Sequence, residues 1–267
     1  MPLARRLFLD QPGVAAGVLA RFSKRTRASE TSYATVHDYC DSLDHLPQIT
    51  GLDGDLKNVQ RPWTVKALLR NVPPPARILE IGGGEPIVSG TLAELGYDVT
   101  LVDPYDGAGN GPTAYETYTQ SFPNVKIVRE YFAPGMQNFH PGSFDAIFSV
   151  SVLEHLPPEA AGKCFQAIRE FLAPNGASIH CFDFILRGIG EEYDWTNARN
   201  ILSQQAGLEG GSTEVDLDQF LEKLTSDVET FFLSPQGHHL WRGGLPYDKF
   251  PFRRVVSLQT IALTSRQ

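Results

Sequence analysis

Three consecutive glycines follow a run of branched apolar residues in the stretch Arg77-Ile78-Leu79-Glu80-Ile81-Gly82-Gly83-Gly84-Glu85-Pro86. An amphipathic segment over residues 87–95 comes directly after it. This order of patterns predicts a buried strand, a tight turn and the start of a helix. Glycine permits positive φ and lets a ligand approach the backbone without meeting a Cβ atom. The unpaired N–H groups at the helix start favour a polar or negative ligand group, so the turn is a candidate binding site.

A second predicted strand ends in a carboxylate about twenty residues beyond the glycines. It covers residues 98–103 and ends at Asp103. An acidic side chain at this distance from a glycine turn can accept hydrogen bonds from both hydroxyl groups of a ribose. The alternative, a turn-forming Asp before Pro104, leaves the three glycines unexplained. The two features together predict a cofactor that contains a nucleoside.

The spacing of the glycines distinguishes between nucleoside cofactors. The dinucleotide fingerprint requires a third glycine where this chain has Ile87, which is too bulky for close packing of a strand on a helix. The pattern Glu80-x-Gly82-x-Gly84 instead resembles motif I of class I S-adenosylmethionine-dependent methyltransferases. Pro86 departs from that motif, which often has a glycine there, and would alter the helix start without removing the turn.

Two later segments extend this resemblance. Residues 144–156 (FDAIFSVSVLEHL) are similar to the fourth strand and the following Leu-Glu-His turn of the small-molecule branch of the family. Residues 172–177 look like the entry to its fifth strand, with Asn175 in place of a glycine. Because the three signals occur in the expected order and spacing over residues 76–184, the chain is identified as a member of that family.

The hydrophobic pattern and the resemblance together predict an α/β fold: a Rossmann-like, doubly wound seven-stranded sheet with an antiparallel last strand and an N-terminal helical cap. Strands are predicted over 77–82, 98–103, 125–129, 144–150 and 177–184, with helices over 29–46, 64–70, 87–95, 113–121, 158–172, 193–206 and 216–225. The resemblance implies that two further apolar runs, 228–233 and 255–263, are the sixth strand and the antiparallel seventh. The expected domains are a helical extension over 1–75 and a methyltransferase domain over 76–267, with substrate-side elaborations over 185–252.

Composition narrows the partners and the compartment. The net charge is −8, so general attraction to nucleic acid is not expected, and no apolar run approaches the ~20 residues that span a bilayer. Residues 1–27 nevertheless carry six basic groups and one acidic group. They are read as a targeting peptide, an arm for an acidic partner or, as favoured here, a short amphipathic helix with a solvated loop. Three cysteines without a Cys-x-x-Cys pair favour a reducing compartment, so the cytoplasm is the expected location.

The resemblance also implies which residues bind S-adenosylmethionine. They are Glu80, Gly82, Gly83, Gly84, Asp103, Glu130, Ser149 and Val150. Glu80 would orient the turn or the amino group of the cofactor, unless its carboxylate only closes a local hydrogen bond. Glu130 would present a polar group to the adenine, with Tyr131 or Phe132 offering a ring face, and the alternative is a plain surface position. Ser149 and Val150 would flank the methionine part through backbone atoms.

Methyl transfer sets the requirements for the catalytic residues. It is an in-line displacement in which orientation contributes on the order of 7–11 kcal/mol, and an oxygen acceptor also needs a base within hydrogen-bond reach. The candidate bases are His238, His239, Asp183 and His155. The first two lie in the connection over 234–252, which is too long for a hairpin and would lie at the ligand-binding edge of the sheet. This connection could instead be a surface loop or an oligomer contact.

A metal site is not predicted. Some members of the family bind a metal through a Glu-x-x-Glu-His segment, but this chain has Ser151 at the first of those positions. His155 is as consistent with packing beside the cofactor as with catalysis. Asp183 is predicted to lie near the carboxyl end of the fifth strand, which makes it a better general-base candidate than His180 on the same strand.

These observations predict an S-adenosylmethionine-dependent methyltransferase that acts on a small molecule, at the hydroxyl group of a sugar or a secondary metabolite. One alternative is an NAD-dependent oxidoreductase, which Ile87 and the Leu-Glu-His segment disfavour. Another is a non-catalytic cofactor-binding protein with the same fold. Methylation of nucleic acid or protein is disfavoured by the acidic balance and by the lack of an Asn/Asp-Pro-Pro-Tyr/Phe tetrapeptide after the fourth strand. The sequence does not decide between a monomer and a homodimer.

Overall fold

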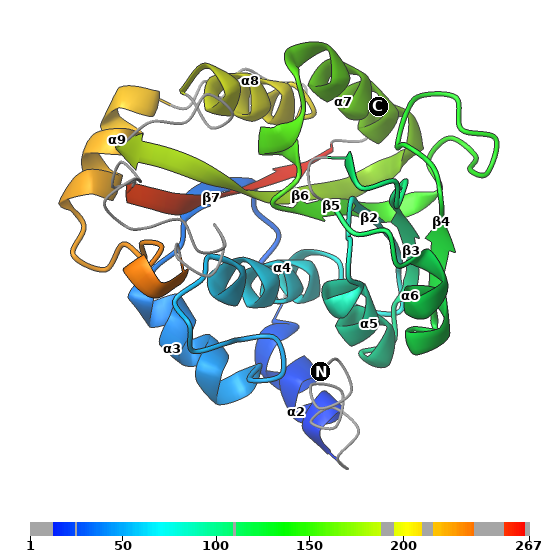
Figure 1. Cartoon of the computed structure of the whole chain (residues 1–267), viewed down its shortest axis with the longest axis horizontal. Coiled ribbons are helices and arrows are strands. Elements are labelled where there is room, and N and C mark those ends of the chain that lie inside the picture. Colours follow the sequence, from blue (N-terminus) through cyan, green and yellow to red (C-terminus); the bar gives the residue numbers. More distant parts are fainter. Residues whose placement is uncertain are drawn as a thin grey trace.

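The computed structural model describes residues 13–24, 26–108, 111–187, 195–209, 216–237 and 254–264. Seven strands form one sheet in the order β1-β7-β6-β5-β2-β3-β4 (Figure 1). The strands are β1 (Glu30–Tyr33), β2 (Arg77–Ile81), β3 (Asp98–Val102), β4 (Val125–Val128), β5 (Phe144–Val150), β6 (Leu172–Arg187) and β7 (Arg254–Leu263). Strands β2 to β6 are parallel to their neighbours within that group, whereas β7 runs antiparallel to both β6 and β1. The doubly wound sheet with its antiparallel last strand is therefore confirmed.

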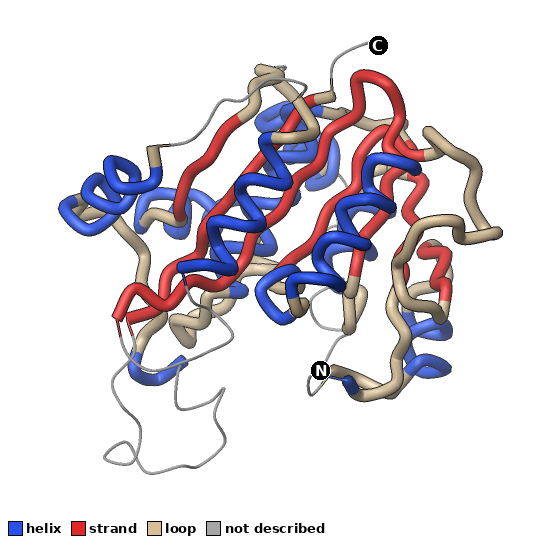
Figure 2. The backbone as a smooth tube through the Cα atoms, turned by 90° about the horizontal axis from the view of Figure 1, so that it is seen from above, coloured by secondary structure: helices blue, strands red, loops and turns tan. Residues whose placement is uncertain are grey.

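Helices cover both faces of the sheet. They are α2 (Val14–Phe22), α3 (Val36–His45), α4 (Lys57–Asn71), α5 (Ile87–Glu94), α6 (Tyr115–Ser121), α7 (Pro158–Phe171), α8 (Trp195–Ala206) and α9 (Leu217–Ser226), with a short 3-10 helix η2 (Leu153–His155). Figure 1 places α7 and α8 on one side of the strands and α4 and α5 on the other, and Figure 2 shows helices that run along the direction of the strands they cover. Each side buries its own apolar cluster against the sheet. None of the described helices is both long and apolar enough to cross a membrane.

The register of the central strands brings the predicted motifs to one edge. Ile81 at the end of β2 is paired with Val102 on one side and with Ser149 on the other. The glycine turn, the carboxylate after β3 and the segment after β5 therefore leave the sheet side by side. In open α/β sheets this carboxyl edge is where ligands bind.

The N-terminal segment differs from the prediction of one helix over residues 29–46. Residues Glu30–Tyr33 form the edge strand β1, which pairs antiparallel with β7 from Glu30↔Ile261 to Tyr33↔Leu258, and the helix begins only at Val36. The buried Tyr33 donates its hydroxyl hydrogen bond to Asp227 (2.7 Å). Pairing with the edge of the sheet outweighs the local helical pattern of residues 30–33. The pairing supplies hydrogen bonds to backbone N–H and C=O groups of β7 that local contacts would leave without partners.

The predicted sixth strand over residues 228–233 is not formed. This segment makes two isolated bridges, Thr35↔Thr230 and Phe232↔Val256, and the side chain of Val228 is 92% exposed. Strand β1 already pairs with residues 258–261 in the middle of the free edge of β7, so the second apolar run can only continue that edge for a short distance. The prediction was wrong because strand order is a tertiary property.

Helix α4 is longer than the predicted helix over 64–70. It spans Lys57–Asn71 and contains Pro62 in its interior instead of in its first turn. An internal proline removes one backbone hydrogen bond and crowds the preceding turn, at a cost of about 3 kcal/mol in an isolated helix. Twelve of the fifteen residues of α4 are buried, so packing against the sheet offsets that cost. The extra turns carry Lys57, Gln60 and Arg61 toward the carboxyl edge.

Candidate functional site

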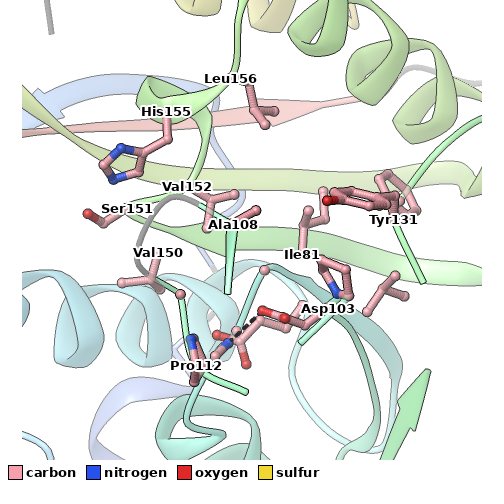
Figure 3. A pocket seen from close by; sticks show the side chains of 18 of the residues that line it. Ile81, Asp103, Ala108, Pro112, Tyr131, Val150, Ser151, Val152, His155 and Leu156 are labelled. Atoms are coloured by element: carbon pink, nitrogen blue, oxygen red, sulfur yellow. Dashed lines mark hydrogen bonds between the residues drawn. The ribbon is translucent and has the colours of Figure 1, made fainter. Parts of the chain in front are cut away.

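A cavity of about 620 Å³ lies at the carboxyl ends of β2, β3 and β5. Figure 3 shows Asp103 and Tyr131 on one side of it and Ser151 and His155 on the other. The wall includes the glycine turn, the segment after β3, the loop after β4, the segment after β5, two residues of α4 and one face of α7. The lining residues used below are Lys57, Arg61, Glu80, Gly82, Gly83, Gly84, Asp103, Asp106, Pro112, Tyr131, Phe132, Val150, Ser151, Val152, His155 and Leu156.

The glycine turn requires glycine at each of its first two positions. Gly82 has φ +63°, and a Cβ atom there would lie 2.9 Å from both methyl carbons of Val152. A Cβ atom on Gly83 would lie 2.5 Å from Cδ1 of Leu101 and 2.8 Å from Cδ of Glu80. Contacts with the protein's own side chains therefore require glycine at these two positions, and the approach of a ligand to the turn stays a prediction.

Asp103 holds this turn in place. Its carboxylate accepts hydrogen bonds from the backbone N–H of Gly84 (3.1 Å) and of Tyr105 (2.8 Å). The hydroxyl of Tyr105 donates in turn to the carbonyl of Gly84 (2.8 Å). Burial raises the pKa of Asp103, and the two N–H groups partly counteract that shift. Each carboxylate oxygen retains a further lone pair, so Asp103 can support the turn and still accept a ligand hydroxyl.

Glu80 lies beneath the turn. It is 2% exposed and its carboxylate accepts a hydrogen bond from the hydroxyl of Ser89 on α5. Burial raises the pKa of Glu80 to about 7, while Ser89 and the positive charge of Arg61 lower it. The carboxylate therefore closes a local hydrogen bond and lies in the cavity wall, and its role toward a ligand stays a prediction.

The loop after β4 contributes rings in place of the expected acid. Tyr131 and Phe132 line the cavity, whereas Glu130 does not and accepts a hydrogen bond from Asn138 (2.9 Å) instead. The hydroxyl of Tyr131 donates to Asp106 (2.5 Å), so it links this loop to the segment after β3. Sequence reasoning missed Asp106 and Pro112. Their segment between β3 and α6 is rich in glycine and proline, and this composition is the one signal that could have marked it as a loop at the site.

The end of β5 divides into a cavity side and a core side. Val150, Ser151, Val152, His155 and Leu156 line the cavity. The side chain of Ser149 instead points into the core, where its Oγ lies 2.7 Å from Nδ1 of His180. A role of Ser149 toward a ligand would therefore rest on its backbone alone. His155 is exposed at the cavity wall.

His180 belongs to a buried polar chain instead of the site. Its Nε2 lies 2.8 Å from Oγ of Ser178, and Ser178 donates to the side chain of Gln205 on α8 (3.0 Å). Gln205 donates back to the carbonyl of Ser178 (2.8 Å). Burial lowers the pKa of His180 to about 3, so the imidazole is neutral and both ring nitrogens have partners. This series of hydrogen bonds links α8 to β6.

The depressed pKa of His180 predicts a pH-dependent stability. Below pH 6.5 an unfolded His binds a proton that the folded His180 does not bind until about pH 3. As the pH is lowered through this window, the free energy of unfolding should therefore fall by about 1.4 kcal/mol per pH unit. We expect urea titrations of wild type and His180→Leu to show that the stability advantage of wild type shrinks between pH 7 and pH 5. An advantage that does not change with pH would contradict the assignment.

A second polar group lies beside the cavity, between α4, η2 and β6. Gln60 donates from Nε2 to Oδ1 of Asp183 (2.7 Å), and the backbone N–H of Asp183 donates to Oε1 of Glu154 (2.9 Å). Lys57 donates from Nζ to the carbonyl of Val150 (3.4 Å). Both carboxylates are nearly inaccessible, with 2% exposure for Glu154 and 7% for Asp183. The pKa of Asp183 is raised to about 7 by burial and by Glu154, and Lys57 opposes that shift.

Asp183 thus does not line the cavity, whereas Lys57 and Ser151 do. The pKa of Glu154 is also raised, chiefly by burial, and Lys57 lowers it. Sequence reasoning missed Lys57, Gln60 and Arg61, because no local motif marks them.

His238 and His239 lie outside the described residues. Among the residues that are described, no group of three or more His, Cys, Asp or Glu side chains is arranged to hold a metal ion.

Part of the chain is similar to known proteins. Residues 55–184 match the family described as a methyltransferase domain. An uncharacterized protein of Mycobacterium tuberculosis is 34% identical over 124 residues, which cover 45% of this chain and 39% of that protein. The ubiquinone biosynthesis O-methyltransferase of Pseudomonas aeruginosa is 31% identical over 101 residues, covering 38% of this chain and 41% of the enzyme. The chain thus spans about two fifths of the length of these curated relatives.

A solved structure with similar extent is the 1,6-didemethyltoxoflavin-N1-methyltransferase of Burkholderia thailandensis. It is 18% identical, covers 94% of this chain and 91% of its own, and has a TM-score of 0.44.

Proposed function

Residues 55–184 belong to the methyltransferase-domain family, and from this premise we propose that the protein transfers a methyl group from S-adenosylmethionine to a small molecule. The observation that carries the proposal is the juxtaposition of the glycine turn with Asp103. The backbone N–H of Gly84 is bonded to the Asp103 carboxylate in the wall of a cavity of about 620 Å³. This volume lies within the usual range for small-molecule and cofactor sites, about 300–1,000 Å³.

The cavity suits this cofactor from end to end. Tyr131 and Phe132 offer ring faces to an adenine, and Asp103 can accept the ribose hydroxyls. The segment after β5, with Val150 and Ser151, lines the cavity away from Asp103 and Tyr131, and the amino-acid end would be held there. Gly82 and Gly83 line the cavity without a side chain, so a ligand there can approach their backbone. When bound, the sulfonium of the cofactor supplies an electrophilic methyl carbon.

The chain contributes orientation and proton acceptance. The acceptor must approach in line with the bond that breaks, and well-placed walls supply on the order of 7–11 kcal/mol of the effect. Val150, Ser151 and His155 form the wall that faces the acceptor side. A hydroxyl acceptor also needs a base, and the candidates are Asp183, His155, His238 and His239. Asp183 is favoured because it lies among buried polar groups beside the cavity.

Acceptor chemistry is proposed as O-methylation. Support comes from the printed function of the Pseudomonas aeruginosa relative, an O-methyltransferase that shares 31% identity over 101 residues. Further support comes from the polar groups around Asp183, which suit a hydroxyl better than an apolar carbon acceptor. The net charge of −8 disfavours a nucleic-acid substrate.

Calorimetric titration with S-adenosylhomocysteine and with NAD tests the proposal. We expect the wild type to bind the former and not the latter. Asp103→Ala should weaken binding by about a hundredfold or more, because two hydrogen bonds to a charged group at about 1.5–3 kcal/mol each are lost. Asp103→Asn keeps the shape and one acceptor oxygen, so we expect a smaller loss. Wild-type protein that fails to bind S-adenosylhomocysteine would refute the proposal.

A further inference from the structure

A set of buried polar side chains from four parts of the chain meets at the acceptor side of the cavity. Its members, called here the polar subsite, are Lys57, Gln60, Ser151, Glu154 and Asp183. Lys57 and Gln60 come from α4, Ser151 from the segment after β5, Glu154 from η2, and Asp183 from the part of β6 that extends beyond β5. Three members are more than nine-tenths buried, with Gln60 at 0%, Glu154 at 2% and Asp183 at 7% exposure.

Some polar atoms of this subsite lack partners. Oε1 of Gln60 is buried and has no hydrogen-bond partner among the described residues. The hydroxyl of Ser151 and the carboxylate of Glu154 interact with each other, which lowers the pKa of Glu154, but within the described part of the chain neither Oγ nor Oε2 has a partner that meets hydrogen-bond distance and geometry. A buried polar atom without a partner costs about 1–3 kcal/mol. Such atoms directly behind Lys57 and Ser151, which line the cavity, therefore indicate a missing ligand.

The chemistry of these atoms specifies the ligand. An amide oxygen and a carboxylate oxygen only accept hydrogen bonds, and a serine hydroxyl can accept as well as donate. The missing group must consequently be a hydrogen-bond donor with more than one N–H or O–H. This leaves two classes, a cationic amine and a pair of neighbouring hydroxyls.

The charges of the subsite favour the hydroxyls. The charged groups that face Asp183 are Glu154 from η2, Lys57 from α4 and Asp55 from the turn before α4. The ammonium of Lys57 already balances one carboxylate of the Glu154–Asp183 pair, and the proximity of the pair favours retention of a proton by Glu154, whose carboxyl can then also donate to a hydroxyl oxygen but not to an ammonium. A second cation would face Lys57 across the same small space, whereas neutral hydroxyls meet no such repulsion.

We propose that the polar subsite binds two neighbouring hydroxyl groups of the methyl acceptor and that Asp183 accepts the proton of the one that is methylated. The inference rests on the proposed function. In the step, the hydroxyl oxygen forms a bond to the methyl carbon of the cofactor while the carbon–sulfur bond breaks and leaves its electron pair on sulfur. The proton of the hydroxyl passes to the Asp183 carboxylate. Gln60 and Glu154 position that carboxylate through Oδ1 and the backbone N–H.

Saturation-transfer NMR on the full chain loaded with S-adenosylhomocysteine tests the class of ligand. The probes share one carbon frame: a vicinal cyclohexanediol, the matching vicinal diamine, and cyclohexanol. We expect the strongest transfer to the diol, a weaker signal from cyclohexanol and the weakest from the diamine. Ser151→Ala and Glu154→Gln should weaken diol binding by about tenfold, because each removes or alters one polar partner. Glu222→Gln, an exposed substitution on α9, is the matched control and should leave the diol signal unchanged.

The outcomes separate this inference from the proposed function. If S-adenosylhomocysteine does not bind, the proposed function fails first. If it binds and the diamine outcompetes the diol, or the diol gives no transfer, the hydroxyl assignment is overturned while the proposed function stands. If Glu154→Gln fails to fold, as judged by loss of S-adenosylhomocysteine binding, Ser151→Ala and Gln60→Met carry the test. Diol binding that none of the folded variants weakens would also overturn it.

Discussion

Substitution of Gly83 by alanine is expected to lower the affinity for S-adenosylhomocysteine by about a hundredfold and the free energy of unfolding by about 1–3 kcal/mol. The new Cβ atom would lie 2.5 Å from Cδ1 of Leu101 and 2.8 Å from Cδ of Glu80. Neither neighbour can move away easily. Leu101 is fully buried, and the Glu80 carboxylate is held by Ser89. The turn itself must therefore shift toward the cavity, where the ligand would lie.

Gly162→Ala on α7 is the control for this substitution. A Cβ atom at Gly162 meets nothing within 4 Å, and alanine is favoured over glycine inside a helix by up to about 1 kcal/mol. This variant should thus be as stable as wild type or slightly more so, with unchanged binding. Calorimetry gives the affinities and thermal unfolding gives the stabilities. Wild-type affinity in Gly83→Ala would mean that the turn does not contact the cofactor.

Asp183→Asn is expected to slow methyl transfer by about 10²–10⁴-fold, the usual contribution of a general base, with little effect on S-adenosylhomocysteine binding. The amide has nearly the shape of the carboxylate and keeps an oxygen for the Gln60 hydrogen bond, but it cannot take a proton from the acceptor. Transfer of labelled methyl groups from S-adenosylmethionine into a metabolite extract provides the readout. Asp218→Asn, on the exposed face of α9 with a side chain 90% exposed, is the matched control and should keep full activity.

The pH dependence of the same reaction distinguishes a base from a merely structural carboxylate. Asp183 accepts a proton only when ionised, and its pKa is raised to about 7 by burial and by Glu154. The wild-type rate should accordingly rise as the pH increases through about 7 and level off above it. Asp183→Asn should lose this limb together with the rate. A slow variant that retains the wild-type pH profile would assign the base elsewhere, with His155, His238 and His239 as the remaining candidates.

Local pattern was sufficient for the centre of the sheet and for the cofactor side. The apolar run before Gly82 could only be a buried strand, and three glycines at its end demand a turn that side chains would block. Residues 98–103 follow as the next strand, so the parallel register places Asp103 beside Gly84. These relations depend on contacts within about twenty residues and on the strand period of two, and both can be recognised in the sequence alone.

The tertiary structure decided the order of the edge strands and the direction of several side chains. Strand β1 reaches β7 across more than two hundred residues, with Glu30 paired to Ile261, and thereby takes the edge that residues 228–233 were expected to fill. Gln60 meets Asp183 although 123 residues separate them, and neither carries a local motif for the other. Glu130 turns to Asn138 while Tyr131 faces the cavity, and His180 is enclosed within a buried polar chain. Edge pairing and side-chain direction depend on which surfaces are already occupied when the layers pack, and that information is spread over the whole chain instead of any one stretch of it.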